Sequence, residues 1–418
     1  MNEVVLFPKT NIRGTIKVPP SKSYAQRVIA LSALSQDNVV ISNIGNSEDV
    51  QAAKKIIASL GVQFIEDNDS LIVIRPIENT NQPIEIDCGE SGLSTRLFSA
   101  FSLLFDQEVI INGSGSLKNR TMDMAIEGLQ QFGKNVISND GKIPLVISGK
   151  TSNYSVELDG SISSQFITGV LLVAPFLNKD TEIVVKNPTS KPYLSMTLEL
   201  LRDFQLEFDQ SGFHYFKIEG NQEVARPVDY VVEGDWSSAS FLTVSAALGG
   251  EVELLGLKKY SKQGDRRIID ALEKFGASIE WNRNDLKVKK NQMIPFEIDA
   301  TECPDLFPPL AVLAAYANGK STIIGSDRLL HKESNRATAI QTEFSKIGIK
   351  VLIEDNKMHI YGGTINRDKV VEFFSHNDHR MAMALSLFSI GSTAEIIIHD
   401  SGAIDKSYPH FYDDFNSL

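Results

Sequence analysis

The amino-acid sequence predicts an α/β (α+β) protein built from six βαβαββ repeats, three in each of two lobes. Three observations indicate this fold class. Six segments of the chain share one layout, which recurs about every 70 residues. Each segment contains a helix that is apolar on every side, which is typical of a buried helix. A run rich in β-branched residues follows most of these helices, as expected for a strand.

The six apolar helices are predicted where small or polar residues give way to runs rich in Ala, Leu and Ser. A Ser, Asp, Glu or Asn stands at or near each start, where its side chain can cap the helix. The segments open at Ser21, Glu90, Ser161, Asp235, Cys303 and Asn377. Ordinary capping explains such a residue at any single helix, so a functional role requires the same extra chemistry at several of these openings.

An amphipathic helix is predicted after the β-rich run in each of the first five repeats. One example is DVQAAKKIIASLGV at 49–62, and another is RRIIDALEKFGAS at 266–278. Gly61, Gly133 and Gly276 stand where a C-terminal cap requires left-handed backbone. One or two short strands then complete each of these repeats, which gives the local order βαβαββ.

The predicted division of the chain places a first lobe at 19–227 and a second lobe at 1–18 together with 228–418. The break is placed near Ala225, before the run VDYVVEGDW. The N-terminal segment resembles two short strands with a turn near Gly14 and has no helix of its own, so we expect it to join the C-terminal lobe. A cleft between two lobes is a usual place for a ligand site.

The composition is that of a soluble globular protein. The chain has 418 residues, of which 42% are hydrophobic and 22% are charged. The sequence contains neither an apolar run long enough for a membrane span nor the layout of a signal peptide. Cys88 and Cys303 provide neither a disulfide framework nor a zinc-ligand spacing. We therefore expect a cytoplasmic protein.

The charge of the chain limits its partners. The formal net charge is -12 and the isoelectric point is about 5.2. Nucleic acid is disfavoured as a partner, because binding to a phosphate backbone requires a basic surface. An acidic protein that binds a small anion must gather Lys and Arg in one place. The distribution of basic residues over the helix openings is therefore informative.

Cations and a glycine stand at the first two openings. Lys22 begins the first apolar helix, and Ser23 and Arg27 are four residues apart on one helix face. At the second opening Gly92 would let a ligand approach the backbone closely. The loop GSGSLKNR, which follows the second repeat's first β-rich run, supplies Arg120 beside flexible glycines. Helix N-termini bind anions readily, so these residues are candidates for an anion site.

The third opening is polar rather than charged. Ser163, Ser164 and Gln165 precede a wholly apolar helix, and burying such side chains without partners is unfavourable. They are expected to face a polar ligand or to cap the helix. Arg96 lies inside the second apolar helix and is interpreted as structural.

The later repeats contain the densest charge. Lys332 and Arg336 are predicted on one helix face with Glu333 between them, although like charges four residues apart repel each other. Arg380 starts a buried helix, where an unused cation is unexpected. Lys406, in a Gly- and Asp-containing loop, would be a solvated surface residue if considered alone.

Two kinds of site are disfavoured by the sequence. The seven histidines show no HExxH spacing, so no metal site is predicted. Neither a GxxxxGK[ST] nor a GxGxxG motif occurs, so nucleotide binding has no support.

Seven segments follow one another in the order found in one enzyme family. They are PSKSYAQR, GSISSQF, SKPY, EGDWSSAS, HKESNR, NDHRMAM and KSYPHFY. From about Pro8 to Tyr412 the chain resembles the 5-enolpyruvylshikimate-3-phosphate synthases. The resemblance implies an inside-out α/β barrel with two lobes of three βαβαββ units. It also implies transfer of the enolpyruvyl group of phosphoenolpyruvate to the 5-hydroxyl of shikimate 3-phosphate, with release of phosphate, in chorismate and aromatic amino acid biosynthesis. No cofactor is implied, and we expect a monomer without nucleic-acid or membrane partners.

The resemblance also implies the site residues. Shikimate 3-phosphate would bind to Lys22, Ser23, Arg27, Ser163, Ser164, Gln165, Ser190, Asp305 and Lys332. Phosphoenolpyruvate would bind to Lys22, Gly92, Arg120, Gln165, Arg336, Arg380 and Lys406. Asp305 matches the proton acceptor of the family, although sequence alone would favour an N-cap there. Glu333 and Lys22 are the expected proton donors, and the resemblance does not divide the role between them.

The chain departs from the family pattern around Gly92, and two rival functions are compatible with parts of the sequence. Glu90 and Leu93 replace the usual Asn and Thr around Gly92, which is expected to leave room for the inhibitor glyphosate.

The first rival is the sister family that transfers enolpyruvate to UDP-N-acetylglucosamine. It has a cysteine where this chain has Gly115 and an asparagine where it has Ser23. The second rival is an inactive binding protein of the same fold.

Overall fold

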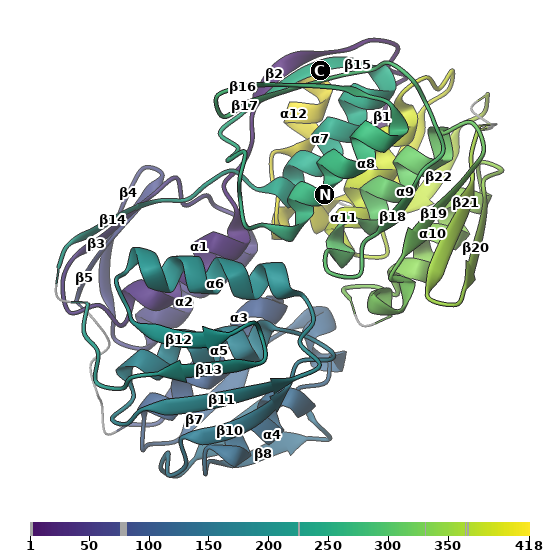
Figure 1. The fold of residues 1–418 in the computed structure, drawn as a ribbon. Helices are drawn as coiled ribbons and strands as arrows, with labels where there is room; N and C mark the ends of the chain where they lie inside the picture. Colours follow the sequence, from purple (N-terminus) through teal and green to yellow (C-terminus); the bar gives the residue numbers. More distant parts are fainter. Residues whose placement is uncertain (1–2, 76–81, 225, 331, 364, 366–367) are drawn as a thin grey trace. The chain divides into compact units, whose positions relative to one another are not determined.

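The computed structural model describes residues 3–75, 82–224, 226–330, 332–363, 365 and 368–418. The chain divides into two compact units, here called the N-lobe (Pro20–Val232) and the C-lobe (Met1–Pro19 with Glu233–Leu418) (Figure 1). The predicted break before Val228 differs from this division. Residues Val228–Val231 form strand β14, which pairs with a strand of the N-lobe, so the boundary follows at Val232. Ala225, near the predicted break, is outside the described residues.

The N-lobe contains three sheets around three apolar helices. Its helices are α1 (Lys22–Ser32), α2 (Glu48–Ser59), α3 (Gly92–Ser99), α4 (Asp123–Gln131), α5 (Gln165–Val173) and α6 (Lys191–Asp203), with short 3-10 segments η1 (Ala100–Leu104), η2 (Gly115–Asn119) and η3 (Ala174–Phe176). Its strands are β3 (Val39–Ser42), β4 (Gln63–Asp67), β5 (Ser70–Arg75), β6 (Ile84–Asp87), β7 (Val109–Asn112), β8 (Asn135–Asn139), β9 (Lys142–Ser148), β10 (Ser155–Asp159), β11 (Thr181–Lys186), β12 (Phe208–Ser211), β13 (Tyr215–Ile218) and β14. The sheet orders are β14-β3-β5-β4, β6-β7-β9-β8 and β10-β11-β13-β12.

The C-lobe repeats this plan. Its helices are α7 (Trp236–Gly249), α8 (Ile268–Phe275), α9 (Phe307–Tyr316), α10 (Arg336–Ser345), α11 (His379–Ser386) and α12 (Phe411–Ser417), with η4 (Gly264–Arg267), η5 (Pro304–Leu306), η6 (Ser326–Leu329), η7 (Leu387–Ser389) and η8 (Ser401–Lys406). Its strands are β1 (Glu3–Leu6), β2 (Ile12–Lys17), β15 (Gly250–Leu255), β16 (Ser278–Asn282), β17 (Asp285–Lys289), β18 (Glu297–Asp299), β19 (Lys320–Ile324), β20 (Lys350–Glu354), β21 (Lys357–Tyr361), β22 (Val371–Phe374) and β23 (Ile396–His399). The sheet orders are β16-β17-β15-β2, β18-β19-β21-β20 and β1-β23-β22.

Each sheet has one parallel pair of strands joined to antiparallel ones, which is the βαβαββ order predicted from the sequence. The parallel pairs β6–β7, β10–β11 and β18–β19 are each linked through an apolar helix. Two strands break the sequential order. Strand β14 precedes α7 but pairs with β3, while β2 precedes α1 but pairs with β15. Strand β2 therefore belongs to a C-lobe sheet although the N-lobe follows it in sequence, and β14 belongs to an N-lobe sheet although the C-lobe follows it.

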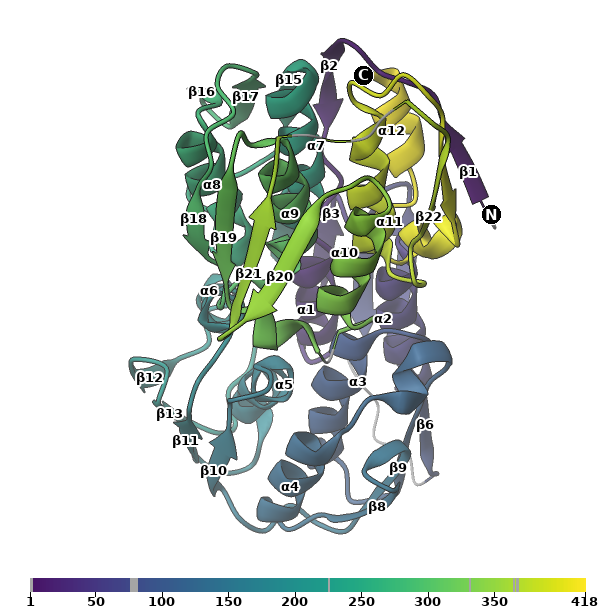
Figure 2. The same ribbon diagram turned by 90° about the vertical axis from the view of Figure 1, so that its right-hand side faces the viewer.

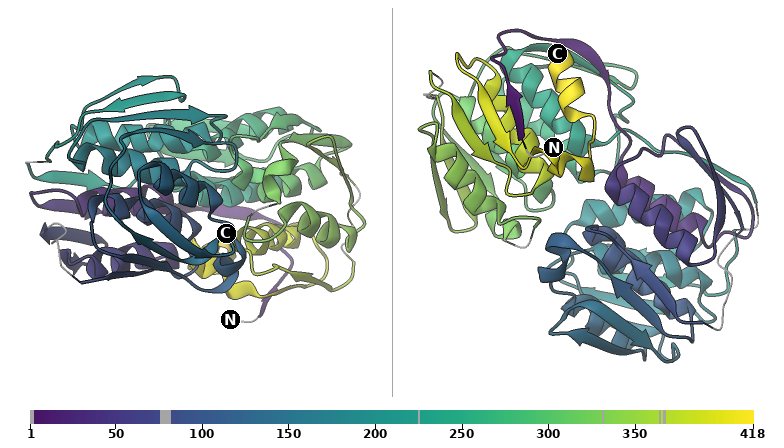
Figure 3. Two further views of the ribbon diagram at one scale, coloured as in Figure 1. Left: turned by 90° about the horizontal axis from the view of Figure 1, so that it is seen from below. Right: turned by 180° about the vertical axis from the view of Figure 1, so that it is seen from behind.

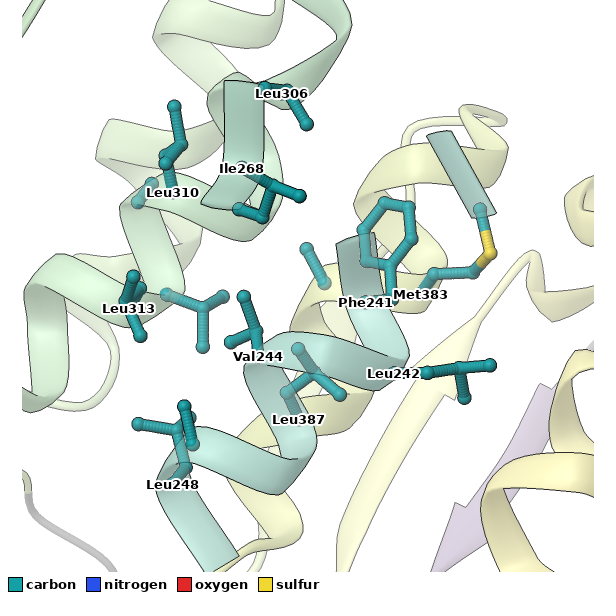
Figure 4. Packing of buried hydrophobic residues seen from close by; sticks show 14 of the residues in the cluster. Phe241, Leu242, Val244, Leu248, Ile268, Leu306, Leu310, Leu313, Met383 and Leu387 are labelled. Atoms are coloured by element: carbon teal, nitrogen blue, oxygen red, sulfur yellow. The ribbon is translucent and has the colours of Figure 1, made fainter. Parts of the chain in front are cut away.

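The apolar helices form the cores, as their composition predicts. In the N-lobe α3 packs on α5, and α1 contacts both. In the C-lobe α9 contacts α7 and α11, and the β18–β21 sheet lies along α9 and α10 (Figure 2). Figure 4 shows Val244 and Leu248 of α7 and Leu313 of α9, which belong to the same buried cluster as Met383 and Leu387. The predicted fold class is confirmed, with helices inside and sheets outside each lobe.

The predicted glycine caps of the helices are confirmed, whereas one predicted turn is not. Gly61, Gly133 and Gly276 follow α2, α4 and α8 with positive φ values, as helix C-caps require. The predicted turn at Gly14 is wrong, because Gly14 lies inside β2. A Cβ atom there would be 2.7 Å from the side chain of Leu418, so glycine serves close packing instead. Strand β1 and helix α12 both belong to the C-lobe (Figure 3).

Candidate functional site

Lys22 is held at the first turn of α1 by a carboxylate from α2. Ser21 caps α1, accepting a hydrogen bond from the Tyr24 backbone nitrogen. The Lys22 Nζ lies 2.7 Å from Asp49 Oδ2, and the two side chains are 13% and 7% exposed. The ammonium group is therefore positioned before any ligand arrives. Asp49 was not predicted, since its only local signal is an acidic residue in the first turn of α2.

Arg27 is buried and joins three helices of the N-lobe. Its Nη1 donates to the Ser23 carbonyl oxygen at 2.7 Å, and its Nε donates to Thr197 Oγ1 at 3.1 Å. Its Nη2 reaches Thr168 Oγ1 and the Tyr193 carbonyl oxygen. Burial lowers the pKa of Arg27 to about 10. The guanidinium thus ties α1 to α5 and α6, and its predicted binding role would act from this fixed position.

Gly92 leaves space for an arginine at the start of α3. A Cβ atom on Gly92 would lie 2.5 Å from Arg120 Nη1. Arg96, interpreted from the sequence as structural, donates to the Gly92 carbonyl oxygen at 3.2 Å and to Gln165 Oε1 at 3.3 Å. Three predicted site residues, Gly92, Arg120 and Gln165, therefore gather around Arg96. In the sequence, only the four-residue spacing from Gly92 to Arg96 could have indicated that Arg96 contacts the site residues.

Glu90 is directed toward the loop that follows β7. Its carboxylate accepts a hydrogen bond from Ser116 Oγ at 3.4 Å and covers the α-carbon of Gly115 so closely that a Cβ atom there would overlap it. Gly115 also has a φ of 55°, which disfavours any other residue. Glu90 and Gly115 are thus matched to each other, which accounts for the position of this unexpected acid.

The predicted serines lie in two adjoining loops of the N-lobe. Ser163 Oγ accepts from the Gln165 nitrogen at 3.2 Å, and Ser164 is buried directly before α5. Ser190 precedes α6 with a φ of 54°, a left-handed conformation. Thr189 Oγ1 donates to the Gly160 carbonyl oxygen at 2.7 Å, which joins the two loops. The openings of α5 and α6 are therefore neighbours.

The charged residues of the C-lobe converge on Asp305, which lies in η5 before α9. Its carboxylate accepts from Arg336 Nη1 at 2.7 Å and from Arg380 Nη2 at 2.9 Å, and Lys332 Nζ lies 3.3 Å away. Arg336 also donates to Glu333 Oε2 at 2.7 Å. Five of the six predicted residues of this lobe thus form one cluster built from separate segments of the chain.

The structure corrects the predicted helix face of Lys332 and Arg336. Helix α10 begins at Arg336, so Lys332 lies in the preceding segment rather than on the helix. The two cations share the carboxylate of Asp305, which offsets their repulsion. The negative charge that compensates Lys332 and Arg336 therefore comes from a distant segment of the chain and not from a neighbour on the same helix.

The pKa of Asp305 reflects this cluster. Burial alone raises the pKa of the Asp305 carboxyl, but Arg380, Lys332 and Arg336 outweigh it and hold the pKa well below its usual range. Burial lowers the pKa of Arg336, while the carboxylates of Asp378, Glu333 and Asp305 outweigh it and raise the pKa well above its usual range. In the arrangement described here Asp305 is a carboxylate and Arg336 is a guanidinium.

Asp378 is a buried partner of two arginines of the cluster and was not predicted from the sequence. Its buried carboxylate accepts from Arg336 Nε at 2.8 Å and from Ser334 Oγ at 3.0 Å. It also caps α11 by accepting from the Arg380 backbone nitrogen at 2.9 Å. Asp378 therefore orients both arginines. The sequence showed only its N-cap position before an apolar helix.

Ser237 and Lys406 complete the C-lobe site. Arg380 Nη1 donates to Ser237 Oγ at the start of α7. Lys406 is buried at the end of η8, which packs against α11, the helix of Arg380. The sequence-based expectation for Lys406 alone, a solvated surface residue, is therefore wrong. Within the described ranges, no group of three or more His, Cys, Asp and Glu side chains could hold a metal ion.

The chain is similar to known proteins over its whole length. Residues 7–415 match the family model of EPSP synthase (3-phosphoshikimate 1-carboxyvinyltransferase). A 3-phosphoshikimate 1-carboxyvinyltransferase from Clostridium novyi is 37% identical, covering 100% of this chain and 98% of the relative. One from Haemophilus influenzae is 32% identical, with 100% and 99% covered.

Solved structures share the fold. An EPSP synthase from Acinetobacter baumannii has a TM-score of 0.84 at 23% identity, covering 100% of this chain and 98% of that one. The enolpyruvyl transferase NikO from Streptomyces tendae has a TM-score of 0.77 at 16% identity, with 100% and 97% covered. With its fold, its family model and its curated relatives in agreement, the chain belongs to the EPSP synthase family.

Proposed function

We propose that this transferase moves the enolpyruvyl group of phosphoenolpyruvate to the 5-hydroxyl of shikimate 3-phosphate, releasing phosphate, in aromatic amino acid biosynthesis. The convergence of Lys332, Arg336 and Arg380 on Asp305 carries the proposal. Both substrates bring a phosphate and a carboxylate, and Arg and Lys are the side chains that bind these groups. The names of the curated relatives agree with this substrate pair.

The proposed contacts are those implied by the family resemblance. Shikimate 3-phosphate would meet Lys22, Ser23, Arg27, Ser163, Ser164, Gln165, Ser190, Asp305 and Lys332. Phosphoenolpyruvate would meet Lys22, Gly92, Arg120, Gln165, Arg336, Arg380 and Lys406. The polar openings of α1, α5 and α6 support the first assignments. The cation cluster of the C-lobe supports the second.

Asp305 would act as the proton acceptor only once substrate is bound. Three cations hold its pKa well below the usual range, so it is a weak base in the arrangement described. Anionic substrate groups that engage Lys332, Arg336 and Arg380 compete for the same donors. Their negative charge raises the Asp305 pKa and makes it a stronger base for the attacking hydroxyl. Glu333 and Lys22 are the proposed donors of a proton to the methylene carbon.

Position 115 argues against the sister enzyme that uses UDP-N-acetylglucosamine. A side chain at Gly115 would overlap the carboxylate of Glu90, so a loop cysteine could not occupy this place without moving that acid. Ser23 rather than asparagine follows Lys22. An inactive binding protein would have no need for Asp305, Glu333 and the three cations to be held in contact.

Phosphate release from phosphoenolpyruvate tests the proposal. We expect release with shikimate 3-phosphate and none with UDP-N-acetylglucosamine or without an acceptor. Lys22→Met is expected to reduce turnover at least about 100-fold, because it removes a positioned cation beside the reacting groups. Lys150→Met is the matched control, since the Lys150 side chain is 79% exposed and its ion pair with Asp106 is a surface contact. Substantial turnover by Lys22→Met would refute the assigned role.

We also propose that the enzyme is a cytoplasmic monomer. Among the described residues no helix has the length and hydrophobicity for a membrane crossing, and both cysteines are buried as free thiols. Light scattering during gel filtration should give a mass near 46.2 kDa. A mass near twice that value would contradict the monomer.

A further inference from the structure

Asp265 is a buried carboxylate that the proposed chemistry does not use. It lies in η4 directly before α8, and only 4% of the residue is exposed. Its Oδ1 atom has no hydrogen-bond donor among the residues that the structure describes. Burying a carboxylate oxygen in this way is unfavourable unless the group is protonated or acquires a partner. The position of Asp265 therefore requires an explanation.

The surroundings of Asp265 connect it to the anion-binding cluster. The Ser237 hydroxyl, which accepts a hydrogen bond from Arg380 Nη1, also neighbours the carboxyl group of Asp265. Segment η4 packs against α7 and α8. The charged and titratable groups that face Asp265 are Asp235 at the start of α7, Cys303 and Asp305 around η5, and Arg380 of α11.

Burial and the carboxylates of Asp305 and Asp235 disfavour a negative charge on Asp265, whereas Arg380 favours it. Burial, followed by the negative charge of Asp305, raises the pKa of Asp265 to about 7, although Arg380 opposes the shift. Close to neutral pH the group is therefore divided between its protonated and ionised forms. Any new negative charge beside Arg380 changes that division.

We propose that Asp265 is a positioning residue that couples anion binding at Arg380 to the uptake of a proton from solvent. The inference rests on the proposed function, in which Arg380 binds the anionic phosphoenolpyruvate. The bound anion adds to the negative charge of Asp305 and Asp235 and takes part of the attraction of Arg380. Both effects favour the protonated form of Asp265.

Ser237 allows the network to accommodate both forms. When Asp265 is ionised, the Ser237 hydroxyl can donate to its carboxylate while accepting from Arg380. When Asp265 is protonated, its own hydroxyl can donate to Ser237 Oγ. Only a proton moves between solvent and a carboxylate oxygen, so no bond of the substrate forms or breaks in this step.

The test uses sulfate as the anionic probe, because sulfate does not titrate near neutral pH. Sulfate is titrated into the whole enzyme, with and without shikimate 3-phosphate, at constant ionic strength between about pH 6 and pH 8.5. Tryptophan fluorescence reports binding, since Trp236 adjoins Ser237 and Trp281 packs on Trp236 within the same lobe. Arg380→Gln should abolish the fluorescence change if sulfate binds at this cluster.

We expect the sulfate affinity of the wild type to fall with rising pH, by at most about tenfold per pH unit above the pKa of Asp265. Asp265→Asn should bind sulfate with little dependence on pH, because the amide stays uncharged. Asp270→Asn, an exposed acid on α8, should keep the wild-type slope. A purely structural role would weaken binding at every pH without removing the slope.

Three outcomes would overturn the inference: a wild-type affinity that does not change with pH, a slope that persists in Asp265→Asn, or a response to sulfate that survives Arg380→Gln. If Asp265→Asn does not fold, Ser237→Ala replaces it. Loss of the Ser237 donor should move the slope to higher pH, and an unmoved slope counts against the coupling. Turnover of the wild type is measured on the same preparations. Absent turnover would refute the proposed function, whereas the sulfate slope is independent of turnover.

Discussion

Asp378→Asn is expected to destabilise the C-lobe, because it removes the charge that is most deeply buried beside Arg336. Asp378 and Arg336 both have fully buried side chains, and their closest atoms are 2.8 Å apart. The amide oxygen can still cap α11 from the place of Oδ1, whereas the NH2 group in the place of Oδ2 can donate to Ser334 but no longer accepts from Arg336 Nε. Arg336 keeps Asp305 and Glu333 as partners.

The magnitude follows from these contacts. Removing one partner of a buried ion pair costs about 3–5 kcal/mol when the other is left uncompensated. Two remaining carboxylates offset part of this loss, so we expect the free energy of unfolding to fall by about 2–3 kcal/mol. With a urea m-value of about 3 kcal/mol/M, the midpoint would decrease by roughly 0.7–1 M.

Equilibrium unfolding in urea, followed by tryptophan fluorescence, measures this lobe selectively. The chain has two tryptophans, Trp236 and Trp281, and both belong to the C-lobe. Asp413→Asn is the matched control, because the Asp413 side chain is 84% exposed and a surface change should stay within about 0.5 kcal/mol. An Asp378→Asn variant as stable as this control would refute the reasoning, since Asp305 and Glu333 would then suffice to hold Arg336.

Two further predictions concern the N-lobe arginine and the pH dependence of stability. Gly92→Ala should raise the KM for phosphoenolpyruvate at least about tenfold and weaken inhibition by glyphosate, since the new methyl group would lie 2.5 Å from Arg120 Nη1 and displace it. Unchanged steady-state kinetics would contradict this expectation. Because burial and then Asp305 raise the pKa of Asp265 from 3.8 to about 7, the native state retains a proton that the unfolded state releases, and wild-type stability declines as pH rises through this window. Asp265→Asn should therefore gain stability over the wild type between pH 4 and pH 7, by at most about 4 kcal/mol, and a constant difference in urea unfolding would exclude the linkage.

The sequence predicted the features that are local along the chain. Apolar helices, their polar first turns and the glycines after α2, α4 and α8 depend on residues a few positions apart, so periodicity and capping identify them. The exchange of β2 and β14 between the lobes was not predicted in full. Strand pairing is a choice among distant segments, and β14 has the same alternating pattern whichever sheet it joins.

The sequence predicts candidate site residues but not the side chains that hold them in place. Family resemblance supplied Arg336 and Arg380, but Asp378 and Ser237 became visible only in the structure. Arg336 and Asp378 are 42 residues apart in sequence, and Arg380 and Ser237 are 143 apart. Spacing carries no information about contacts at such separations. The same limit explains why Asp49, which holds Lys22 from 27 residues away, was missed.

The carboxylate partners of the site cations share a property that bears on how an acidic protein binds anions. In each lobe a cation of the site is already paired with a carboxylate: Lys22 with Asp49, Arg336 with Asp378, and Arg380 with Asp305. These pairs fix the cations in place, so little side-chain entropy remains to be lost when a ligand binds. They also neutralise most of the local field, so a single weak anion gains little by binding. A ligand with several anionic groups can share several of these cations at once, and proton uptake by a carboxyl group such as Asp265 would remove one competing charge. Selection for such ligands therefore follows from the paired carboxylates as much as from the cations themselves.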